Sequence, residues 1–302
     1  MPAQTGCVYF EAEAAPRWQV PTATVGGMPV AVIDRARSAE LMVDVALARR
    51  RAKQPPLIFT SANGQVLSLC ARQDDVRQLF LEADLIHADG MPLVHVSRLV
   101  GGPLLPERVA TTDLFHDVAR VAQRRNARFY LLGATKTVVD QAVSRVRALY
   151  PKLNVVGHAC GYMRRSGDEE RAIAEINRAR PDILWVGLGT PYELEFALRY
   201  RERLHGVGLI KTAGGLFDFL SGKIPRAPLW MQRAGLEWAY RIYIEPRRLA
   251  TRYLVTNPHA LFLLLTRTRQ TAVQTWDAPP TAPSSWDTGP RAAPVWERAN
   301  HD

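Results

Sequence analysis

The sequence predicts an α/β protein with a doubly wound, mostly parallel sheet that has helices on both faces, followed by a basic helical appendage. Along residues 28–222, short apolar runs alternate with longer stretches of helical periodicity. This alternation is typical of parallel strands that are joined by crossover helices. Several of the short runs are apolar at every position, as expected for strands whose two faces are both covered.

Composition and charge limit the classes of protein to which this chain can belong. The chain has 302 residues, of which 47% are hydrophobic and 23% charged, as in ordinary globular proteins. The cysteines Cys7, Cys70 and Cys160 are too widely spaced for a disulfide framework or a zinc site, and they fit a reducing cytosol. The net charge of +10 favours an anionic partner, although an arginine-rich coding habit explains it equally well. No apolar run reaches the roughly 18 residues that span a bilayer, and no apolar signal segment opens the chain.

The N-terminal third contains the first strands and helices. Residues 1–27 carry Pro, Gly and Thr without a period, which predicts a flexible arm. The elements expected next are a strand or hairpin arm at 29–33, a helix at 39–51, a buried strand at 57–60, and helices at 65–71 and 75–82. Asn63 follows the buried strand, and turn or cap formation is the commoner use of such an Asn.

Asp89 is the residue on which the functional argument depends. The apolar run at 85–87 predicts a buried strand, and a helical pattern follows from Met91. In open α/β sheets, ligands bind in the crevice outside the carboxyl ends of the strands, where Asp89 would stand. A carboxylate there can accept a proton from a substrate hydroxyl. Asp is also a favoured helix cap, and the spacing alone favours that interpretation.

The second half of the domain continues the alternation. The elements expected there are a helix at 114–124 with Thr112 or Asp113 as its cap, a strand at 128–132, a helix at 137–150, a strand at 153–158, a helix at 168–179, a strand at 183–187, a helix to 203 and a strand at 208–212. Gly187-Leu188-Gly189 lacks the third glycine of a dinucleotide fingerprint, because Tyr192 holds that position. Two glycines before a helix N-terminus still leave room for a diphosphate.

The character of the sequence changes after the last strand. Residues 223–270 interleave Trp, Tyr and Leu with arginines, which suits helices that lie in a membrane interface. A helical pair packed on the sheet, with its arginines in water, is the alternative. Residues 271–302 are rich in Pro, Thr, Ser and Ala and predict a disordered tail.

Several segments together resemble the WecG/TagA/CpsF glycosyltransferases, which are glycosyltransferase family 26. The segments are Thr60–Asn63, Ala83–Pro92, Glu107–Val109 with Asp113, Tyr130–Ala134, Gly161-Tyr162, Pro181–Pro191, Gly214–Asp218, Arg226–Pro228, Gly235–Trp238 and Glu245–Arg248. Each match is weak alone, but their order and spacing cover about residues 55–257. The resemblance assigns residues 28–222 to a catalytic domain and residues 223–270 to a membrane-binding appendage.

The resemblance implies an inverting transfer of a sugar from a UDP-sugar to a polyprenyl-diphosphate-linked saccharide, in surface polysaccharide biosynthesis. It implies no cofactor and no metal, and it places the enzyme peripherally on the cytoplasmic face of a bacterial membrane. Asp89 is then the base, Asn63 contacts the sugar or acceptor, and Arg108 faces a phosphate. The substrate-binding candidates are Thr60, Ser61, Gly90, Met91, Asp113, Gly133, Gly187, Gly189, Thr190, Glu193, Lys211, Gly214 and Gly215. The candidates for contact with the membrane and for closure of the active site are Arg226, Arg241, Arg247, Arg248 and Arg252.

Two departures and two alternatives accompany this reading. Pro191-Tyr192-Glu193-Leu194 stands where many members have Pro-Lys-Gln-Glu, so Glu193 replaces a glutamine, and a threonine replaces the usual glycine at Thr111 or Thr112. The first alternative, supported only by residues 192–194, is a catalytically inactive membrane-peripheral scaffold. The second is a nucleic-acid-binding protein, which we do not expect because no recognised binding motif is present. The donor sugar, the acceptor glycan and a homo-oligomeric state stay open.

Overall fold

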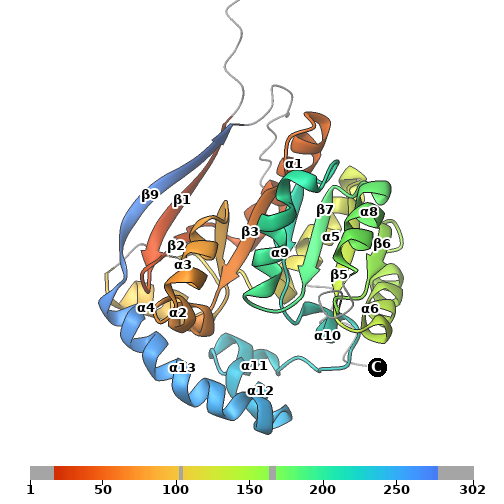
Figure 1. The fold of residues 1–302 in the computed structure, drawn as a ribbon. Coiled ribbons are helices and arrows are strands. Elements are labelled where there is room, and N and C mark those ends of the chain that lie inside the picture. The colour runs from red at the N-terminus through yellow and green to blue at the C-terminus, as the bar shows by residue number, and fades with distance from the viewer. Residues whose placement is uncertain (1–16, 102–104, 163–167, 278–302) are drawn as a thin grey trace, which may run out of the picture.

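The computed structural model describes residues 17–101, 105–162 and 168–277, and the expectations for residues 1–16 and 278–302 lie outside them. Its centre is a sheet of six strands (Figure 1). These are β3 (Leu57–Ala62), β4 (Leu85–Ala88), β5 (Arg128–Gly133), β6 (Asn154–Ala159), β7 (Ile183–Gly187) and β8 (Leu209–Thr212). The order is β4-β3-β8-β7-β5-β6, and all neighbours are parallel. The predicted doubly wound parallel sheet is confirmed.

Helices cover both faces of this sheet (Figure 1). One face carries α1 (Arg35–Arg51), α5 (Thr111–Arg125), α6 (Lys136–Leu149) and α10 (Leu216–Leu220). The other face carries α2 (Gly64–Cys70), α3 (Asp74–Leu81), α4 (Met91–Leu99), α8 (Glu169–Ala179) and α9 (Tyr192–Tyr200), which continues into a short 3-10 turn at Arg201–Arg203. Successive strand residues point to opposite faces, so Ile58 packs on one side and Phe59 on the other.

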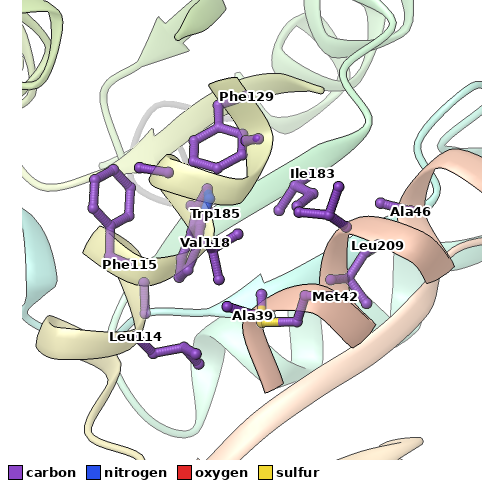
Figure 2. Close-up of a cluster of buried hydrophobic side chains, with 14 of the residues drawn as sticks. Ala39, Met42, Ala46, Leu114, Phe115, Val118, Phe129, Ile183, Trp185 and Leu209 are labelled. Carbon is purple, nitrogen blue, oxygen red and sulfur yellow. The ribbon is translucent and has the colours of Figure 1, made fainter. Parts of the chain in front are cut away.

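The core on the α1 and α5 side is built around Trp185 of β7 (Figure 2). The Trp185 ring is fully buried, and its centroid lies 4.9 Å from that of Phe115 and 5.9 Å from that of Phe129. Met42 of α1 and Leu209 of β8 belong to the same cluster. Cores of this kind are close-packed, so the strands hold the residues at their carboxyl ends in fixed positions.

The predictions of a flexible arm at residues 1–27 and of a disordered tail at residues 271–302 are wrong where the structure describes these residues. Strand β1 (Arg17–Val25) pairs antiparallel with β2 (Met28–Ala31) and with β9 (Arg269–Asp277). Figure 1 shows β1 and β9 as a long ribbon beside the main sheet. The prediction failed because β1 finds its longer partner in β9, far away along the chain, and local composition carries no sign of such a pairing.

Two further expectations need adjustment. Helix α5 begins at Thr111 with Ala110 in the cap position, so neither Thr112 nor Asp113 caps it, because Asp113 is drawn into ion pairs inside the first turn. Strand β3 extends to Ala62, so Ser61 belongs to the strand rather than to the turn after it.

The C-terminal segment forms α11 (Leu229–Arg233), α12 (Glu237–Ile244) and α13 (Pro246–Thr266). Helix α13 packs against α2 and α4, and it buries Leu249, Ala260, Leu263 and Leu264. Within the residues described, no helix is both long enough and apolar enough to cross a membrane. These three helices therefore cover one end of the sheet, as Figure 1 shows along its lower edge.

Candidate active site

A cleft of about 420 Å³ lies at the carboxyl ends of β3, β4 and β8. Its floor includes Ser61 of β3, Asp89 after β4 and Thr212 of β8. Its opposite wall is formed by α12 and α13, which contribute Arg241 and Arg252. Open α/β sheets bind ligands at this edge, so the position of the cleft agrees with the position expected for Asp89.

Asp89 lines this cleft and does not cap the following helix. The cap residue of α4 is Gly90, and no side chain caps that helix. The Asp89 carboxylate instead faces Thr111, whose backbone N–H and hydroxyl both donate to Oδ2 at 3.5 Å. Burial raises the pKa of the Asp89 carboxyl, while the charges of Arg108 and Lys211 act to lower it. A carboxylate that is held weakly and has a raised pKa is suited to accept a proton.

Lys211 is a buried cation below the floor of the cleft. Its side chain is fully buried, and Nζ donates to Ser61 Oγ at 2.8 Å and to the Thr212 carbonyl at 3.1 Å. Burial lowers the pKa of Lys211 to about 8, against the opposing charges of Asp89 and Glu193. Lys211 therefore fixes the Ser61 hydroxyl, and its positive charge acts on the Asp89 carboxylate.

Glu193, from the first turn of α9, is buried outside the lining of the cleft. Its Oε2 accepts a hydrogen bond from the Gly214 N–H at 2.8 Å. Burial raises the pKa of Glu193 to about 7, although the Gly214 hydrogen bond and Lys211 lower it. Glu193 thus positions the turn at Gly214 and Gly215, and this turn does line the cleft.

We expect Glu193→Gln to flatten the pH dependence of stability. Because the pKa of Glu193 is raised from 4.5 in the fold, the folded state holds the proton more tightly, and stability falls as pH rises between about 4.5 and 7. A shift of this size corresponds to about 3 kcal/mol. Chemical denaturation of both proteins across that range measures the difference in unfolding free energy, which should grow with pH in favour of the variant. A difference in unfolding free energy that stays the same at every pH would contradict the raised pKa of Glu193.

Arg108 lines the cleft, but its guanidinium is engaged in ion pairs. It donates to Glu237 Oε2 at 2.7 Å and to Asp113 Oδ2 at 2.9 Å. Arg226 joins the same two carboxylates, each at 3.2 Å. Although burial alone would raise the pKa of the Asp113 carboxyl, Arg226, Arg108 and Arg35 bring it below its usual value. This cluster ties α12 to the body of the domain, and it leaves Arg108 largely neutralised.

Arg241 and Arg252 differ from Arg108 because neither has a carboxylate within ion-pair distance among the residues described. The Nε atoms of both guanidiniums are buried and have no hydrogen-bond partner there. Arg241 lies over the Phe219 ring, 5.4 Å from its centroid, and Arg252 lies 4.9 Å from that of Tyr253. Buried donors without acceptors cost free energy, so the two guanidinium groups are suited to pair with an anion that enters the cleft.

The other predicted residues divide between those that line the cleft and those that lie outside its lining. Those that line the cleft, with the residues above, are Asn63, Gly90, Met91 and Thr190. Asn63 Oδ1 also caps α2 by accepting from the Val66 N–H at 3.1 Å, as its commoner use predicts. The predicted residues outside the lining are Thr60, Asp113, Gly133, Gly187, Gly189, Glu193, Lys211, Arg226 and Arg247, and the Arg248 side chain lies outside the described part.

Close packing explains two of the outlying glycines. A Cβ at Gly133 would lie 2.3 Å from the Gly187 carbonyl oxygen, and one at Gly187 would lie 2.8 Å from the Phe217 ring. Thr60 is buried, with its hydroxyl 2.8 Å from that of Thr212. These residues shape the edge of the sheet without reaching the cleft.

Sequence reasoning gave no role to several residues that line the cleft. Glu237 neutralises Arg108, Thr111 faces Asp89, and Trp238 lies against Tyr253 with ring centroids 6.2 Å apart. Glu237 and Trp238 stand in the Gly235–Trp238 segment that carries part of the family resemblance. That motif was the available signal, but only the packing of α12 against Arg108 shows what Glu237 contacts.

The fold and the cleft define an α/β protein with a cleft at the carboxyl ends of parallel strands, beneath a helical cover. The chain belongs to the glycosyl transferase WecG/TagA/CpsF family, whose family model matches residues 23–274, and it is a glycosyltransferase. The resemblance drawn from the sequence motifs is therefore confirmed.

Three relatives share the name N-acetylglucosaminyldiphosphoundecaprenol N-acetyl-beta-D-mannosaminyltransferase. The chain is similar to the protein of Bacillus subtilis strain 168, with 32% identity over 63% of this chain and 73% of the relative. It is 35% identical to that of Bacillus spizizenii strain W23 over 55% of this chain and 63% of the relative. The Staphylococcus aureus NCTC 8325 protein is 26% identical over 64% and 74% of the two chains.

Proposed function

We propose that this protein transfers a sugar from a UDP-sugar to a polyprenyl-diphosphate-linked saccharide with inversion, with Asp89 as the general base. The observation that supports this most directly is the pairing of opposite groups across one cleft. A weakly held carboxylate stands on the sheet side, and two arginines that have no acidic partner among the described residues stand on the helical side. The relatives' names, which specify a polyprenyl diphosphate acceptor and a β-linked product, agree with such a transfer.

The proposed step is a single displacement. The acceptor hydroxyl oxygen bonds to the anomeric carbon while the bond from that carbon to the UDP oxygen breaks. The hydroxyl proton passes to the Asp89 carboxylate, and the bonding electron pair leaves on the β-phosphate oxygen. Arg241 and Arg252 would stabilise the developing charge on the diphosphate, since preorganised cations act most strongly at charges that form in the transition state.

We propose that α11–α13 dock on the membrane that holds the acceptor. These helices expose large apolar side chains, among them Trp230, Tyr243, Leu254, Phe262 and Leu265. Exposed apolar patches of this kind mark interaction surfaces. The wall of the cleft on the same helices includes Leu261 and Leu264, so an apolar chain that leaves the cleft would meet further apolar surface.

The test is a transferase assay with purified full-length protein, labelled UDP-sugars and a polyprenyl-diphosphate-linked acceptor. We expect a labelled lipid-linked product with inverted configuration, formed equally well in the presence of a chelator such as EDTA. A screen of UDP-sugars by thermal shift identifies the donor first, because a ligand that binds only the folded state raises its stability. Absence of product with every donor that binds would favour the inactive scaffold.

A further inference from the structure

A second hollow, of about 690 Å³, lies outside the active-site cleft. It is bounded by the turn between β1 and β2, by the connection from α2 to α3, and by the residues that join α13 to β9. Figure 1 shows the lower ends of β1 and β9 meeting the end of α13 near α2. The hollow shares no lining residue with the cleft, so it is a separate feature of the surface.

Four arginines line this hollow, against one carboxylate. Arg72 and Arg77 come from the α2–α3 region, Arg267 and Arg269 follow α13, and Asp74 is the acidic residue. None of the four arginines has a carboxylate within ion-pair distance in the part of the chain that the structure describes. The hollow therefore concentrates positive charge that the described residues offset with one carboxylate, and such a site favours an anion.

Hydrogen bonds hold the walls of the hollow in place. Arg77 Nη1 donates to the Gly27 carbonyl at 2.9 Å, and the Gly27 N–H donates to the Arg267 carbonyl at 2.9 Å. The Gly26 N–H donates to Thr268 Oγ1 at 3.2 Å. Segments that are distant in the sequence are thus fixed around one concave basic surface, so its shape does not depend on the exposed side chains alone.

The hollow begins where α13 ends, directly after the last turns of a helix that exposes apolar side chains. Phe262 is 58% exposed and Leu265 is 47% exposed, and Arg267 follows within one helical turn. An apolar helix face that ends in a basic concavity matches the boundary between acyl chains and charged headgroups. We propose that this hollow binds the phosphate of an anionic phospholipid headgroup when α13 lies on the membrane. The proposal rests on the membrane docking proposed above and adds a lipid site to it.

A nucleic acid phosphate backbone fits the hollow less well. Proteins that bind single strands combine a basic groove with aromatic side chains on which the bases stack. None of the residues that line this hollow has an aromatic side chain. A lipid headgroup needs only a local basic concavity beside an apolar face.

The test uses full-length Arg267→Gln/Arg269→Gln protein, because both side chains are exposed. Sedimentation with sucrose-filled vesicles compares phosphatidylcholine alone with phosphatidylcholine that contains phosphatidylglycerol. Since each basic residue at an anionic surface contributes a factor of about five, we expect the partition coefficient onto the mixed vesicles to fall about 30-fold. Binding to the neutral vesicles should not change, because the apolar face of α13 is intact.

The matched control is Arg51→Gln/Arg178→Gln, which removes the same charge from exposed positions on α1 and α8, away from α13 (Figure 1). An equal loss in the control would mean that net charge alone drives binding, and it would overturn the site. A second result would also overturn the lipid site: soluble glycerol phosphate stabilises the wild-type protein but not the variant, while the two proteins bind vesicles equally well. So would a larger loss of single-stranded DNA binding than of vesicle binding.

The proposed function is tested independently of this site. Wild-type transferase activity toward a short-chain, water-soluble acceptor is measured without vesicles. If that activity is present while the variant and wild type bind mixed vesicles equally, the lipid site is wrong and the proposed chemistry stands. If wild type binds no vesicles of either composition, both the lipid site and the membrane docking are wrong.

Discussion

Asp89→Asn should lower kcat/KM for sugar transfer by about 10²- to 10⁴-fold while the protein stays folded, because a positioned base contributes that much. Asparagine keeps the size and the hydrogen bond from Thr111, so a loss of activity reports the missing proton acceptor. The reaction needs the ionised carboxylate. Because the pKa of Asp89 is raised, wild-type activity should fall on the acid side at a higher pH than an ordinary aspartate would give.

The pH profile separates this role from a general electrostatic one. The acid limb should be absent from the residual activity of Asp89→Asn, since the group that titrates is gone. Asp75→Asn is the matched control, because Asp75 is exposed on α3 and does not line the cleft. Full transferase activity in Asp89→Asn, with thermal unfolding like that of wild type, would remove Asp89 from the mechanism.

Arg241→Gln/Arg252→Gln should lower kcat by about 10²- to 10³-fold, since the loss of preorganised stabilisation of a developing charge has effects of this size. Neither arginine holds a carboxylate within the described residues, so the substitution breaks no ion pair and should leave the fold intact. We also expect weaker binding of UDP itself. Steady-state kinetics and UDP titration by calorimetry measure the two effects separately.

Arg233→Gln on α11 is the control for the arginine pair, because Arg233 is exposed and does not line the cleft. Substitution of Arg108 should behave differently from that of Arg241. Arg108 is bound to Glu237 and Asp113, so its loss would leave these two carboxylates with fewer cationic partners and weaken the attachment of α12. Unchanged kcat and UDP affinity in the double variant would assign the diphosphate to another part of the cleft.

Local sequence patterns predicted most of the central domain. Runs such as Leu57–Phe59 and Ile183–Val186 are apolar at every position, as is typical of a strand covered on both faces. The same patterns placed Asp89 at the carboxyl end of a strand. The outer sheet was missed because β1 pairs with β9 across almost the whole described chain, and pairing at that separation leaves no local signal.

The sequence by itself determined the alternating α/β order, the family and the place of Asp89 at the edge of the sheet, because periodicity and ordered motifs are properties of the chain. The tertiary structure decided which charges are available. Arg108 lies in a segment of the family resemblance, and Arg241 lies in a basic stretch. The packing of α12 brings Glu237 against Arg108 and neutralises it, whereas the same packing leaves Arg241 beside the cleft. It also brought Arg72 and Arg267 to one hollow. Electrostatic partners depend on distances between elements, and the order of residues does not contain these distances.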